Sequence, residues 1–191
     1  SWNQSQMLTM HLAGGAEAAY NIPQPCWLYG PLDMRALCGA LHALIERHAV
    51  LRTTFEIADD GGFTQHVRVP PEGAELLRQV SCGSVEAAEA IMSADAERGF
   101  ELLGKRGCVM RSKLVRIDGA ERHLLLINVH HIACDGASTE LMRSELGALY
   151  RALSAGGFAA DAGLTELPVQ YVDYALWQRS NAVVQHLESS C

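Results

Sequence analysis

Apolar side chains recur at the spacing of an amphipathic helix in several segments of the chain. The clearest case follows Asp33, where Leu37, Leu41, Leu44 and Ile45 fall on one helical face. Asp33 is also a residue type that caps helix N-termini, so we expect the helix to begin there. Further helices are predicted at Ser5–Leu12, Ser84–Arg98, Ser138–Leu153 and Val169–Leu187.

Short runs rich in apolar, β-branched and aromatic residues alternate with these helices and indicate strands. Asp-Gly turn sequences at 59–62 and 118–119 separate two pairs of runs, as expected for hairpins. The predicted strands are Cys26–Tyr29, Leu51–Ile57, Phe63–Val69, Val109–Ile117 and His123–His130. Helices interleaved with strands predict an α/β or α+β protein with helices packed on a mixed sheet.

Length and composition are those of an ordered chain with a substantial core. The 191 residues are 49% hydrophobic and 19% charged, which excludes disorder. The net charge of −7 argues against a general nucleic-acid binder. No apolar run approaches the roughly 18 residues of a membrane span and no signal peptide is visible, so we expect a cytoplasmic location without membrane contact.

The cysteines and the chain ends add two expectations. No two of the six cysteines stand at a zinc-ribbon or CxxC spacing, so we interpret them as small buried hydrophobes and predict no metal site. The chain opens without an initiator Met, and residues 181–191 stop inside a predicted helix. We therefore expect a fragment of a longer polypeptide.

The most informative stretch covers residues 128–138, between an apolar strand and a helix. The carboxyl end of a strand is where an α/β sheet presents side chains to a cleft. Adjacent strand residues point to opposite faces, so one of His130 and His131 should face the core and the other the cleft. Asp135 and Gly136 then form a tight turn, where glycine permits a backbone shape that other residues resist.

Three interpretations of this stretch remain open from the residues alone. Neighbouring strand histidines cannot readily chelate one ion, which disfavours a metal site. A core histidine with a helix-capping Asp would be purely structural. Alternatively, a histidine serves as general base when a nucleophile attacks an acyl group. Because no Gly-x-Ser-x-Gly elbow is present, direct transfer between two bound substrates then fits better than a covalent acyl-enzyme.

The segment HHIACDG at 130–136 resembles the HHxxxDG motif of the condensation domains of nonribosomal peptide synthetases. That signature is shared with a wider superfamily that includes chloramphenicol acetyltransferase. Further segments match in the family's order over nearly the whole chain. They are RHAVLRTTF at 47–55, similar to RHExLRTxF with Ala49 where Glu is usual; YVDYALW at 171–177, matching YxDYAxW; Ser1 and Gln4 of an SxxQ motif; AYNIP at 19–23; and FEL at 100–102 for FDL.

The resemblance implies a chloramphenicol-acetyltransferase-like fold, a two-layer α/β sandwich. Condensation domains are pseudo-dimers of two such halves. Residues 1–180 correspond to the N-terminal half, and 181–191 to the start of the connection to a C-terminal half that is missing. The resemblance therefore predicts that this chain is the N-terminal subdomain only and is inactive by itself.

The resemblance also implies amide-bond formation between two acyl groups, each carried on the phosphopantetheine arm of a carrier protein. The acceptor's amine attacks the donor's thioester. His131, the second motif histidine, would be the catalytic one, either deprotonating the amine or positioning it. No cofactor or metal bound directly by the domain is implied. The implied partners are carrier proteins, an adenylation domain and the missing half.

Asp135 would have a structural role in this scheme. The resemblance implies that it pairs with Arg47, or otherwise with Arg52, and so supports the turn under His131. Removing one partner of such a buried pair would cost about 3–5 kcal/mol of stability. A His131 ring closed off from solvent, or an Asp135 without a cationic neighbour, would count against this interpretation.

Three neighbours of His131 receive implied roles as well. His130 would face inward and shape the turn, and the Gly136 N–H would stabilise a developing oxyanion. Cys134 would lie near the site and serve as a labelling handle.

Two other classes of protein remain as alternatives. One is a stand-alone trimeric acyltransferase that uses CoA or a carrier protein, although its HHxxxDG motif is expected near the C-terminus. The other is a non-catalytic relative, either an epimerisation domain or a condensation-like domain that docks other enzymes. A docking domain would be expected to have lost the two histidines, which this chain keeps.

Overall fold

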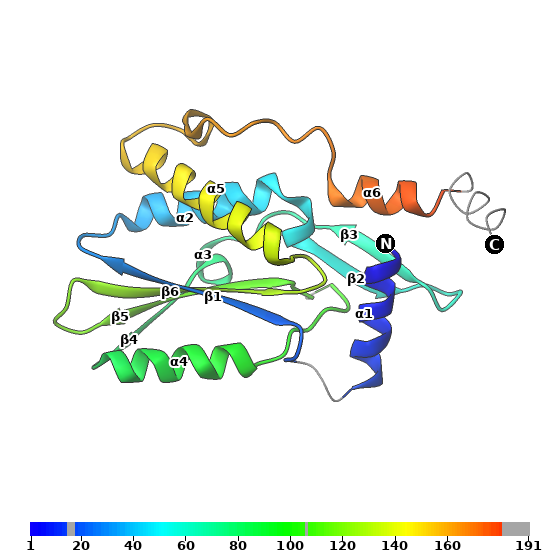
Figure 1. The fold of residues 1–191 in the computed structure, drawn as a ribbon, viewed down its shortest axis with the longest axis horizontal. Coiled ribbons are helices and arrows are strands. Elements are labelled where there is room, and N and C mark those ends of the chain that lie inside the picture. The colour runs from blue at the N-terminus through cyan, green and yellow to red at the C-terminus, as the bar shows by residue number, and fades with distance from the viewer. Residues whose placement is uncertain (15–17, 106, 181–191) are drawn as a thin grey trace.

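The computed structural model describes residues 1–14, 18–105 and 107–180 of the chain. Its central sheet consists of β1 (Asn21–Tyr29), β4 (Arg78–Cys82), β5 (Met110–Ile117) and β6 (Arg122–His130). The strands lie in the order β1-β6-β5-β4 (Figure 1). β1 and β5 pair antiparallel with β6, whereas β4 pairs parallel with β5, so the sheet is mixed.

Helices cover both faces of this sheet (Figure 1). α2 (Met34–Arg47) and α5 (Gly136–Ser154) pack together on one face, and α4 (Val85–Glu97) lies on the other. β6 is therefore buried over all but its first residue. Such a strand needs apolar residues on both sides. Leu125 packs in the cluster of α2 and α5, and Leu124 in the cluster of α4.

Several elements extend beyond one end of the sheet: α1 (Trp2–Ala13), the hairpin β2 (Thr53–Ile57) and β3 (Phe63–Val67), the 3₁₀ turn η1 (Ala49–Arg52) and α6 (Tyr171–Gln178). The short helix α3 (Gly73–Leu76) contacts β4 and β5, and the 3₁₀ turn η2 (Ala159–Ala162) packs on α5 and α2. Leu8 of α1 and Phe55 of β2 share a buried cluster with Leu102. The Ser1 hydroxyl lies 2.9 Å from that of Tyr171, so α1 also contacts α6.

The predicted class, helices on a mixed sheet, is confirmed. The structure adds a layer to the expected sandwich, because α4 covers the face opposite α2 and α5. Asp33 does cap α2, accepting a hydrogen bond from the Ala36 N–H at 2.9 Å. Within the described ranges, no helix has both the length and the apolar character to cross a membrane.

Two strands differ from the predictions for identifiable reasons. β1 begins at Asn21 rather than Cys26. Its first half was not predicted as strand because it contains prolines at positions 23 and 25. Proline is tolerated there because β1 is an edge strand. β4 was not predicted at all, since its five residues contain little apolar sequence and it adds to the sheet only through β5. The predicted helix Val169–Leu187 forms at Tyr171–Gln178, and residues 181–191 lie outside the described part.

Candidate functional site

The turn between β6 and α5 separates the two motif histidines as predicted. His130 is 1% exposed, and its Nδ1 accepts the Ile132 N–H at 3.0 Å. The rings of His11, Tyr20 and Phe100 surround it. Burial, followed by the nearby charges of His11 and His131, lowers the pKa of His130 to about 4. His130 is therefore neutral and holds the turn in shape.

His131 lies on the opposite side and is exposed. Its backbone N–H donates to the Tyr20 carbonyl at 2.8 Å. This hydrogen bond holds the His131 backbone in place and so determines where the side chain projects. The side chain lines an open cavity of about 470 Å³. Polar groups from α1, the end of α2, the turn and the start of α6 line the same cavity: Asn3, Gln4, His48, Asp135, Ser138, Gln170 and Tyr171. The expectation of a histidine open to a cleft is confirmed.

Asp135 does not have the predicted cationic partner. It is the N-cap of α5, and its Oδ1 accepts from the Ser138 N–H at 2.8 Å and the Ser138 hydroxyl at 2.6 Å. These hydrogen bonds lower the pKa of Asp135. No Lys, Arg or His of the described ranges forms an ion pair with it. The free N–H groups of the helix terminus satisfy the carboxylate instead.

The two arginines assigned to Asp135 bind elsewhere. The Arg47 Nε donates to Glu145 Oε1 at 3.2 Å. The Arg52 guanidinium donates to backbone carbonyls, among them that of Ile45 at 3.3 Å. The predicted brace of the turn by Asp135 and an arginine is therefore wrong. The capping role, which the structural interpretation assigned to Asp135, is the one the structure shows.

Replacing Asp135 by Ala is accordingly expected to cost about 1 kcal/mol, rather than the 3–5 kcal/mol of a buried ion pair. Urea unfolding of the complete domain measures this. Asp33→Ala, which removes the equivalent cap of α2, is the matched control and should cost a similar amount. A loss of about 3 kcal/mol or more for Asp135→Ala alone would mean that the carboxylate has a charged partner besides the cap.

Gly136 is also less constrained than predicted. It is the first residue of α5, and its φ is outside the left-handed region. A Cβ built on it would meet nothing within 4 Å. The fold of the described residues therefore does not require glycine there, and its suggested contact with a substrate stays a prediction.

Cys134 lies beside the site but is a poor labelling handle. It is 5% exposed, and burial, with the charge of Asp135, raises its pKa to about 11. The thiolate is the reactive form, so we expect iodoacetamide at pH 7.5 to modify the exposed Cys26 well before Cys134. Peptide mass spectrometry over time would measure the order. Faster modification of Cys134 would mean that the turn opens in solution.

Sequence reasoning gave no functional role to His48, which lines this cavity, or to Glu145, which pairs with it. Glu145 is 4% exposed and contacts both Arg47 and His48. The sequence did contain a sign that Glu145 has a partner. Glu145 lies on the buried face of α5 with Met142 and Leu149, and a buried carboxylate needs a partner. Which residue would supply that partner was not visible in the sequence, since 97 residues separate His48 from Glu145.

The described residues contain no group of three or more His, Cys, Asp or Glu side chains arranged to hold a metal ion.

The site thus combines a turn bearing two histidines, one buried and one exposed, with a mixed sheet covered by helices and an open cavity. A family model described as "Condensation domain" matches residues 1–190, and the chain belongs to that family.

Two peptide synthetases illustrate the similarity. The chain is 38% identical over 171 residues to the bassianolide nonribosomal cyclodepsipeptide synthetase of Beauveria bassiana, covering 88% of this chain and 5% of that protein. It is 35% identical over 182 residues to surfactin synthase subunit 2 of Bacillus subtilis (strain 168), covering 95% and 5%. The chain thus spans only a small part of the synthetases it matches.

Solved structures show the same fold. The X-domain from teicoplanin biosynthesis is 29% identical with a TM-score of 0.76, and the match covers 92% of this chain and 37% of that one. The first condensation domain of the CDA synthetase is 26% identical with a TM-score of 0.69, covering 82% and 38%. The chain therefore spans well under half of these related chains.

Proposed function

We propose that this chain is the histidine-bearing N-terminal half of a condensation domain that forms amide bonds in nonribosomal peptide synthesis. One observation carries the proposal: directly after β6, the His131 side chain lines an open cavity, whereas the neighbouring His130 side chain is buried. Family membership supports the reaction class.

In the proposed reaction an acceptor amine attacks the carbonyl carbon of a donor thioester. The C–N bond forms, the C–S bond breaks, and one proton moves from the amine to the leaving thiolate. His131 serves this step through a ring nitrogen, either by accepting the amine's proton or by holding the amine in line with the carbonyl. The Gly136 N–H, at the N-terminus of α5, is proposed to face the developing oxyanion.

The proposal includes partners and an incomplete site. Donor and acceptor arrive on phosphopantetheine arms of carrier proteins, and an adenylation domain loads them in the cytoplasm, where ATP is available. The second half of the domain closes the other side of the cavity, as the 37% and 38% coverage of related chains suggests. Residues 1–180 form the first half, and 181–191 begin the connection.

An assay with two loaded carrier proteins tests the proposal. The complete domain should form the amide, and this chain alone should not. Adding the C-terminal half in trans should restore product. Product from this chain alone would contradict the two-half site, and no product from the complete domain with any donor would contradict the reaction.

A docking function is the second candidate. It is favoured by the similarity to the teicoplanin X-domain, one structure of which is a complex with OxyB at 28% identity and a TM-score of 0.80. The open His131 favours catalysis over docking. If the complete domain formed no amide but bound a partner enzyme, docking would become the favoured function and catalysis the second candidate.

A further inference from the structure

A second histidine lines the cavity of His131. His48 follows the last residue of α2, and its Nε2 lies 2.5 Å from Glu145 Oε2. The His48 side chain is 16% exposed and that of Glu145 is 6% exposed. The ring therefore reaches the cavity while the carboxylate that orients it is buried.

Glu145 fixes which ring nitrogen faces outward. Its Oε1 accepts from the Arg47 Nε at 3.2 Å, so Oε2 is left for His48. A carboxylate accepts hydrogen bonds, hence Nε2 of His48 carries the proton and Nδ1 of the neutral ring carries a lone pair. A carboxylate behind a histidine also increases the ring's strength as a hydrogen-bond acceptor.

The Nδ1 atom of His48 is available for a ligand. No hydrogen bond from the described residues reaches it. It is also absent from the few side-chain atoms in those residues that are buried without a partner, so it is accessible. An accessible acceptor, held by a buried ion-paired carboxylate, suits a ligand that donates an N–H.

We propose that His48, oriented by Glu145, binds the attacking amine of the acceptor aminoacyl thioester through Nδ1. The inference rests on the proposed function and adds a specificity group to its site. One N–H of the amine donates to His48, which leaves the nitrogen lone pair free to point at the donor carbonyl near His131. A substrate without an amine gains nothing from this contact.

His48→Gln in the complete domain tests the inference, because the glutamine amide can still donate to Glu145. We expect the acceptor KM to rise about ten- to hundredfold, with donor KM and kcat within about threefold of wild type. His66→Gln is the matched control: its Nε2 lies 3.4 Å from Glu56 Oε2 in a surface pair on the β2–β3 hairpin. The control should change none of these values.

A second measurement does not depend on turnover. Imidazole ¹⁵N NMR of the complete domain should show the His48 Nδ1 signal shift on adding alanyl-N-acetylcysteamine thioester, and no shift with the propionyl thioester, which lacks the amine. An unchanged acceptor KM, a parallel rise in donor KM, or equal shifts with both thioesters would overturn the role of His48. Activity that survives His131→Ala would instead overturn the proposed function, so the two failures are distinguishable.

Discussion

His131→Ala in the complete domain is expected to slow amide formation about 10²- to 10⁴-fold without lowering the melting temperature. The side chain is exposed in the cavity, and the backbone N–H of His131 contributes to the fold by donating to the Tyr20 carbonyl. Removing the imidazole therefore costs little packing. Single-turnover kinetics with preloaded carrier proteins, together with thermal unfolding, measure both effects.

His130→Ala is the control with the opposite expectation. Its ring is buried and accepts the Ile132 N–H, so truncation leaves that N–H unpaired and should cost at least about 1–3 kcal/mol of stability. The His131→Ala variant should thus lower the reaction rate and not the stability, and the His130→Ala variant should lower the stability. Normal turnover by His131→Ala at an unchanged melting temperature would refute the assigned role.

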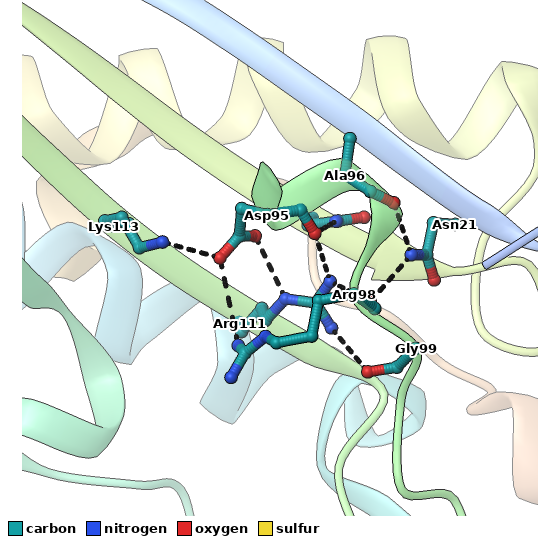
Figure 2. A network of polar contacts seen from close by, with 8 residues as sticks. Asn21, Asp95, Ala96, Arg98, Gly99, Arg111 and Lys113 are labelled. Carbon is teal, nitrogen blue, oxygen red and sulfur yellow. Dashed lines mark hydrogen bonds and ion pairs between the residues drawn. The ribbon is translucent and has the colours of Figure 1, made fainter. Parts of the chain in front are cut away.

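Asp95→Asn is expected to destabilise the domain by roughly 3–5 kcal/mol. The Asp95 side chain is 3% exposed, and it pairs with the Arg111 Nε at 3.0 Å and the Lys113 Nζ at 2.7 Å (Figure 2). The substitution removes the charge that balances two cations on β5. Because Asp95 belongs to α4, the network attaches that helix to the sheet, and urea unfolding should report its loss.

The same carboxylate predicts a pH dependence. Burial alone would raise the pKa of Asp95, but hydrogen bonds and charges of Lys113 and Arg111 outweigh it and lower the pKa. A lowered pKa stabilises the fold above the ordinary Asp value near 3.9, and this contribution is lost as pH falls through the folded-state pKa. The stability difference between wild type and Asp95→Asn should therefore narrow below about pH 4.

An exposed ion pair provides the control for Asp95. Glu140 and Arg143 are 3.4 Å apart on α5, with side chains 73% and 64% exposed. Glu140→Gln should change stability by less than about 1 kcal/mol, because exposed pairs contribute little. Equal losses for Glu140→Gln and Asp95→Asn would mean that burial of the Asp95 network does not determine its contribution.

Much of the architecture could be predicted because it depends on local periodicity. The helix after Asp33, the strand before His130 and the helix after Asp135 are each specified by spacing and caps within one segment. The opposite directions of His130 and His131 follow from strand geometry in the same way. β4 was not predicted because it becomes a strand only by pairing with β5, which lies more than 30 residues further along the chain.

The ion pairs of the site could not be predicted. Arg47 and Asp135 carry opposite charges and stand in two matching motifs, which made their pairing a reasonable hypothesis. In the folded chain α2 and α5 pack so that Glu145 meets Arg47 and His48, while the Ser138 N–H and hydroxyl satisfy Asp135. The charge of a residue therefore predicts that it has a partner of opposite charge or a hydrogen-bonding partner. Which residue becomes that partner depends on how the helices pack.

By itself the sequence determined the class of fold, the family resemblance and the opposite directions of His130 and His131, because each depends on spacing within short segments of the chain. Only the tertiary structure decided that Asp135 is a cap, that Asp95 attaches α4 to the sheet, and that His48 lines the cavity of His131. These features join segments tens of residues apart, and their geometry is set by how helices pack on the sheet.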